Sequence, residues 1–157
     1  MTLGETLHKS LSDWPANTDG PHERTAAADG WTARVKAAAI DTVGAKLHEL
    51  ELTRTAPAPE GATVGGWADG VAKRASGLLE RLKVYEVDAT HNQAVLRSDG
   101  PTVKGDVAGY YEVVLTGTDQ ATVNRYTADR AAGTKREPVP FALTHETVAK
   151  LADDIAG

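Results

Sequence analysis

Cysteine is absent from this sequence of 157 residues. Its absence excludes a disulfide-bonded scaffold, zinc sites built from thiolates, and catalysis by a cysteine nucleophile. Long hydrophobic runs are also lacking, because no stretch approaches the roughly 20 apolar residues that a membrane-spanning helix needs. Residues 1–14 lack the basic start and apolar core of a signal peptide. We therefore expect a cytoplasmic protein with no membrane segment.

An excess of positive charge is missing too. Lysine and arginine number 17 against 22 acidic residues, which gives a formal net charge of -5. Because nucleic-acid binding draws on clustered lysine and arginine, we do not expect a nucleic-acid partner. The hydrophobic share of 41% and the charged share of 25% are those of an ordinary globular protein. The length is typical of one domain, so we predict that residues 1–157 form a single domain.

Three segments carry the apolar spacing of three and four residues that indicates a helix. The first spans residues 3–14. The second spans residues 64–82, with Thr63 as its N-cap, although each glycine in its interior costs about 1 kcal/mol relative to alanine. The third runs from residue 145 to about residue 156, with Thr144 as its cap. Each of these helices has one apolar face, which must pack against another part of the protein.

Alternation of period two indicates strands elsewhere. Residues 31–39 form the first strand, and a second follows through Leu47, Leu50 and Leu52. The shift from odd to even positions between Leu47 and Leu50 indicates a bulge or a strand that starts late. Four further strand-like segments cover residues 83–88, 93–98, 110–116 and 122–128. The order α-β-β-α-β-β-β-β-α predicts an α+β fold with one mainly antiparallel sheet of about six strands and helices packed on one face. Residues 15–30 and 54–62 are expected to be loops or linkers.

No catalytic, metal or cofactor motif is present. The sequence contains no phosphate-binding loop and no serine elbow. Its five histidines lack the close spacing of metal ligands. We therefore predict no catalytic residues, no metal site and no cofactor, and the sequence favours a protein that is not an enzyme.

The aromatic residues point to a surface on the sheet. Tyr110 and Tyr111 are adjacent in a strand, so one faces the helices and the other faces the open side of the sheet. We expect that open side to carry partner-binding residues, because aromatic residues and arginine are enriched at protein interfaces. The residues predicted for it are Tyr110, Glu112, Val114, Arg125 and Tyr126.

Two functions remain open at this point. The first is a small acidic protein-interaction module that binds another protein chain or a second copy of itself as a homodimer. In size and element order it resembles the small secretion chaperones and the immunity proteins of bacteria, a likeness that no motif carries. The alternative is a small-molecule-binding protein or enzyme with a pocket between the sheet and the central helix. Arg97, Tyr111 and Arg125 are the polar groups predicted for that pocket.

Overall fold

The structure is a computed structural model that describes residues 1–15, 22–131, 133 and 135–157. In these residues the helices are α1 (Leu3–Ser12), α2 (Val64–Arg74) and α3 (His145–Ala156). The strands are β1 (His22–Ala28), β2 (Trp31–Ile40), β3 (Gly44–Arg54), β4 (Leu82–Asp88), β5 (Gln93–Ser98), β6 (Thr102–Lys104), β7 (Val107–Thr116), β8 (Gln120–Asp129), β9 (Glu137–Val139) and β10 (Phe141–Thr144). The predicted α+β class with a mainly antiparallel sheet is confirmed.

Threonine caps begin all three of these helices, as the sequence predicted for α2 and α3. The hydroxyl of Thr2 accepts a hydrogen bond from the backbone N–H of Glu5 at 3.0 Å, and Thr63 and Thr144 make the same contact three residues ahead. Each cap satisfies a backbone donor that the first helical turn leaves free.

The central helix is shorter than the predicted 64–82. It ends at Arg74, because Ala75 adopts an extended backbone with φ −68° and ψ 108°. Leu82 belongs to strand β4 instead. Two physical causes favour this ending: Gly77 opposes continuation of the helix, and the segment that follows carries Glu80 to an ion pair with Arg125 on β8.

The hairpin of β2 and β3 contains the predicted bulge. Lys36 lies opposite Glu49, whereas the next residue, Ala37, lies opposite Leu47, so His48 is the extra residue on β3. The bulge lets Leu47 and Leu50 both face the core, although they are separated by an odd number of positions.

The sheet contains ten strands in the described residues, more than the predicted six. Its main path is β1-β2-β3-β8-β7-β5-β4, while β10 pairs with β3, β6 with β7 and β9 with β8. The expected loop over residues 15–30 is corrected, because residues 22–28 form β1; residues 16–21 lie outside the described part of the chain. The additional strands β1, β6, β9 and β10 are held by backbone pairing at edges and therefore need no strong side-chain alternation.

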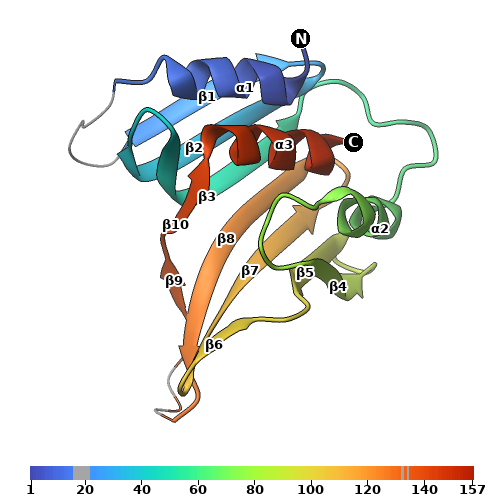
Figure 1. Cartoon of the computed structure of the whole chain (residues 1–157). Coiled ribbons are helices and arrows are strands. Elements are labelled where there is room, and N and C mark those ends of the chain that lie inside the picture. Colours follow the sequence, from blue (N-terminus) through green and yellow to red (C-terminus); the bar gives the residue numbers. More distant parts are fainter. Residues whose placement is uncertain (16–21, 132, 134) are drawn as a thin grey trace.

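The three helices lie on the same face of the curved sheet (Figure 1). Side chains from that face and from the helices form one cluster of buried hydrophobic residues that extends from Leu3 to Ile155. α2 and α3 are joined where the indole N–H of Trp67 donates to the carbonyl oxygen of Ile155 at 2.8 Å. No helix in the described residues is long and apolar enough to cross a bilayer. The opposite face of the sheet, which we call the open face, carries none of these helices.

Candidate functional site

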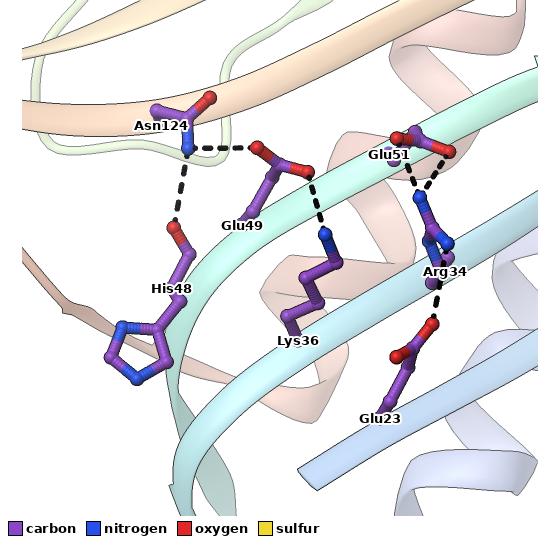
Figure 2. A network of polar contacts seen from close by, with 7 residues as sticks. All are labelled: Glu23, Arg34, Lys36, His48, Glu49, Glu51 and Asn124. Atoms are coloured by element: carbon purple, nitrogen blue, oxygen red, sulfur yellow. Dashed lines mark hydrogen bonds and ion pairs between the residues drawn. The ribbon is translucent and has the colours of Figure 1, made fainter. Parts of the chain in front are cut away.

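Charged residues on β1, β2 and β3 cover one half of the open face. Arg34 donates two hydrogen bonds from Nη2 to the carboxylate of Glu51, at 2.8 and 2.9 Å, and its Nη1 lies 3.4 Å from Glu23. Lys36 lies 3.7 Å from Glu49 (Figure 2). We call these five residues the ion-pair ladder. Each of its charges has a neighbour of opposite sign, and three carboxylates against two cations leave the ladder with one negative charge. Arg34 Nε is buried without a hydrogen-bond partner in the described residues.

Asn124 continues the polar network from β3 onto β8. Its amide Nδ2 donates to Glu49 Oε2 at 3.2 Å and to the carbonyl oxygen of His48 at 3.3 Å (Figure 2). Asn124 thus marks the end of the ladder, and Tyr126, two residues further along the same strand, lies on the same face.

Beyond Asn124 the open face changes from ion pairs to tyrosines and arginines. The tyrosine–arginine surface, as we call it, consists of Tyr85, Arg97, Tyr110, Glu112, Tyr126 and Arg136. Its guanidinium groups lie over aromatic rings: the Cζ of Arg97 is 4.0 Å from the ring centre of Tyr85, and that of Arg136 is 3.8 Å from the ring centre of Tyr126. The rings of Tyr110 and Tyr126 are 6.1 Å apart between centres. Such cation–π contacts stabilise an exposed surface by about 0.5–1 kcal/mol each.

Glu112 is the centre of this surface. Its Oε1 accepts a hydrogen bond from Arg97 Nε at 2.8 Å and another from Arg136 Nη1 at 2.8 Å. Its side chain is only 4% exposed. Burial alone would raise the pKa of Glu112, but the hydrogen bonds from Arg136 and Arg97 outweigh burial and lower that pKa. Glu112 is therefore ionised at neutral pH and holds both guanidinium groups in place.

Strand alternation places these side chains together. Tyr110 and Glu112 occupy alternate positions on β7, and in the β7–β8 register Tyr110 lies opposite Tyr126. Arg97 lies opposite Glu112 on β5. Tyr85 joins them because Lys83 lies opposite Arg97 and Val84 packs against the core, so alternation places Tyr85 on the open face. The register shift between Val84 and Glu86 makes Tyr85 an extra residue and changes the direction only of the residues after it.

The structure brings together most of the predicted partner-binding residues. Tyr110, Glu112, Val114 and Tyr126 share the open face, with Val114 half-buried beside the others. The placement of Arg125 in this group is corrected, because its guanidinium lies over the ring of Tyr111 on the helical side, at 4.5 Å. The reason is geometric: Arg125 and Tyr126 are neighbours in a strand and so point to opposite faces.

The predicted pocket residues are divided between the two faces. Arg97 belongs to the open face, so its assignment to the pocket is corrected. Tyr111 and Arg125 do lie together on the helical side, where Arg125 Nη2 donates to Glu80 Oε2 at 3.0 Å. The same oxygen accepts from the hydroxyl of Thr102 at 2.7 Å. This partly buried group ties the segment after α2 to the sheet.

Two residues of the tyrosine–arginine surface were missed by the sequence analysis. Tyr85 lies within a predicted strand, and its alternation with the inward-facing Leu82 and Val84 would have placed it on this face. Arg136 lies in the segment before β9, where no periodicity gives its direction. The sequence does, by contrast, determine the face of Arg97. Ala94 and Leu96 are apolar and face the core, so alternation puts Arg97 on the open face.

Other features of the chain offer less for recognition. No group of three or more potential metal ligands occurs in the described residues. A groove of about 490 Å³ lies at the β2–β3 turn and β10, lined mostly by apolar atoms.

Comparisons with protein-family models, with curated proteins and with solved structures found no match to this chain. Its function must therefore be argued from its own residues.

Proposed function

We propose that the chain is a protein-interaction module without enzymatic activity, and that the tyrosine–arginine surface is where it binds another protein chain. The observation that carries this proposal is the clustering of three tyrosines and two arginines on a sheet face that no described helix covers. Tyrosine and arginine are the residue types that dominate binding energy at protein interfaces.

The construction of the surface also favours binding. Tyr85 is 61% exposed. The arginines are partly exposed but held by Glu112 and by the rings, so little side-chain freedom remains to be lost when a partner binds. The ion-pair ladder beside it consists of charges paired with one another and acts as a polar border. A partly apolar centre with a polar rim is the usual composition of a protein interface.

The alternative of a pocket between the sheet and α2 has less support. The inward residues of α2, Val64, Ala68 and Val71, are buried in the hydrophobic cluster. Of the polar groups predicted for the pocket, Arg97 lies on the open face, whereas Arg125 pairs with Glu80 and lies over Tyr111. Arg125 Nη1 and Glu80 Oε1 are buried without a hydrogen-bond partner in the described residues. A groove of about 320 Å³ between α2 and β4 is lined by residues such as Asp69, Lys73 and Arg81 at the surface.

Native mass spectrometry of the untagged protein, purified from its own cells, tests the proposal. We expect a bound polypeptide or a second copy. Replacement of Tyr110 and Tyr126 by alanine should lower the bound fraction at least about tenfold, because hot-spot tyrosines each contribute on the order of 1–2 kcal/mol.

The matched control is Val43→Ala, which removes an exposed hydrophobic side chain at the β2–β3 turn, away from the surface. The control protein should keep its partner. Equal loss of the partner in both variants, or a partner that stays on the double tyrosine variant, would count against the tyrosine–arginine surface as the interface.

A further inference from the structure

The guanidinium groups of the tyrosine–arginine surface retain hydrogen-bond donors. Arg97 uses Nε for Glu112, and Arg136 uses Nη1 for Glu112 and for the hydroxyl of Tyr110 at 3.3 Å. Within the described residues, no acceptor is assigned to the two terminal nitrogens of Arg97 or to Nη2 of Arg136. Since an arginine has five N–H donors and no acceptor, and about a third of each side chain is exposed, these donors face solvent and are available to an acceptor from a partner.

The centre of this surface, formed by Arg97, Glu112 and Arg136, has a charge opposite to that of the chain. Two guanidinium groups share one buried carboxylate, so two positive charges less one negative charge leave one positive charge. On the neighbouring strand β4, Lys83 lies 3.9 Å from Asp99, and Glu86 is a further acid at the border of the surface. The chain as a whole has a net charge of -5. An anionic partner is therefore attracted here and repelled from the rest of the molecule.

The stacking of the rings favours a carboxylate over a nucleic acid. Single-stranded nucleic acids bind to platforms on which bases stack against free ring faces. Here a ring face of Tyr85 is covered by Arg97, and a ring face of Tyr126 is covered by Arg136. The surface also lacks the row of cations that would follow a phosphate backbone. Guanidinium groups held over aromatic rings present donors that suit the planar, bidentate geometry of a carboxylate.

We infer that the tyrosine–arginine surface binds an acidic segment of the partner chain, with aspartate or glutamate carboxylates on Arg97 and Arg136. This inference rests on the proposed function and names the chemistry of the partner. A shallow groove of about 200 Å³ next to Arg97, lined also by Lys83, Tyr85, Ser98 and Asp99, offers space for an uncharged side chain of that segment, while its carboxylates bind Arg97 and Arg136.

Fluorescence anisotropy with the full chain tests the inference. The probes are a labelled peptide of about 12 residues rich in glutamate and aspartate with one leucine, its lysine counterpart, and a single-stranded oligothymidine of similar length. We expect the acidic peptide to bind, its affinity to fall as salt rises, and the other two probes to bind at least about tenfold more weakly.

Three variants locate the binding. Arg97→Gln and Arg136→Gln should each weaken binding of the acidic peptide by about five- to tenfold, as expected for loss of one charge-assisted contact. Arg34→Gln is the matched control, because Arg34 lies on the same face with 36% of its side chain exposed, close to the 32% of Arg97. We expect no change in the affinity of that control.

Glu112→Gln separates electrostatics from damage to the fold. It removes the negative charge of the surface, so the acidic peptide should bind about two- to fivefold more tightly to a variant that circular dichroism shows to be folded. A surface that recognised the peptide only through shape would lose affinity instead.

Four results would overturn the inference: no binding of the acidic peptide, equal binding of the oligothymidine, an equal effect of Arg34→Gln, or a homodimer of the purified chain that Arg97→Gln dissociates. If the double tyrosine variant loses its native partner while the partner remains bound to Arg97→Gln and Arg136→Gln, the acidic-segment inference fails and the proposed function stands. If the double tyrosine variant keeps the partner, the proposed function itself fails.

Discussion

Glu112 illustrates how one buried residue can organise an exposed surface. It holds two arginines that would otherwise be mobile. Glutamine in its place offers one carbonyl acceptor and introduces an amide that faces guanidinium donors. We therefore expect Glu112→Gln to lower the free energy of unfolding by about 1–3 kcal/mol at pH 7, measured by urea denaturation. Glu49→Gln, in the more exposed ion-pair ladder, is the control and should cost about 1 kcal/mol or less.

The same residue should contribute to acid sensitivity. The pKa of Glu112 and that of Glu80 are both lowered in the folded state, because hydrogen bonds from arginines outweigh the opposing effect of burial. A lowered pKa stabilises the fold above the unfolded value of about 4.3, and this stabilisation disappears as the pH falls through the folded value. We expect the stability difference between the wild type and Glu112→Gln to shrink when urea denaturation is repeated from pH 7 down to pH 3. A constant difference would show that Glu112 acts without its charge.

For some side chains of the candidate site, the sequence determines which face of the sheet they lie on, and for others it does not. Alternation along β8 fixes Arg125 and Tyr126 on opposite faces, and alternation along β5 separates Arg97 from Leu96; both were available from the sequence. Alternation at the start of β4 likewise separates Tyr85 from Val84. The position of Arg136 depends on where the chain returns after β8, so it has no local signal and is set by long-range pairing.

At the scale of elements, the contact between α1 and α3 depends on the absence of a side chain at Gly4. The N–H of Gly4 donates to Asp153 Oδ1 at 2.7 Å, and the hydroxyl of Thr2 donates to Asp153 Oδ2 at 2.9 Å. A Cβ at position 4 would collide with the carbonyl oxygen of Ala149 and the carboxylate of Asp153.

We expect Gly4→Ala to destabilise the fold by about 1–3 kcal/mol, because overpacking forces the two helices apart. Gly65→Ala in α2 is the counterpart, since its new Cβ would meet Val87 Cγ1 at an ordinary contact distance of 3.6 Å. That variant should instead gain about 0.5–1 kcal/mol from the lower backbone entropy of alanine. Thermal unfolding shows whether each variant is less or more stable than the wild type. A Gly4→Ala variant that is more stable would refute the close packing of α1 on α3.

Elements with strong side-chain periodicity were predictable, and short ones were not. The stripe of α1 and the alternation of β2 reflect burial of one face, which leaves a pattern in the sequence. The strand β1 at the sheet edge and the short strand β9 are held by backbone hydrogen bonds to β2 and β8. Backbone pairing leaves little trace in residue types, which is why ten strands formed where six were expected.

At the scale of the molecule, the continuity of the hydrophobic cluster has a thermodynamic consequence. Buried residues from α1, the sheet, α2 and α3 belong to one cluster. Trp31 and Trp67 lie 5.7 Å apart between ring centres, and Trp67 is bonded to Ile155 at the end of α3. Elements that share one core lose their stabilising contacts together, so unfolding of one should unfold the rest.

We therefore expect one cooperative transition in urea, with the same midpoint by far-ultraviolet circular dichroism and by tryptophan fluorescence. A second variant measures the unfolding of α1 by itself. In a variant carrying Trp31→Phe and Trp67→Phe, fluorescence reports only on Trp14, which packs next to α1 at 8% exposure. Its midpoint should match the circular dichroism midpoint of the same variant, because α1 is buried against both α3 and β1. An earlier Trp14 transition would mean that α1 detaches before the sheet unfolds, and residues 1–157 would then not behave as the single domain that their length predicts.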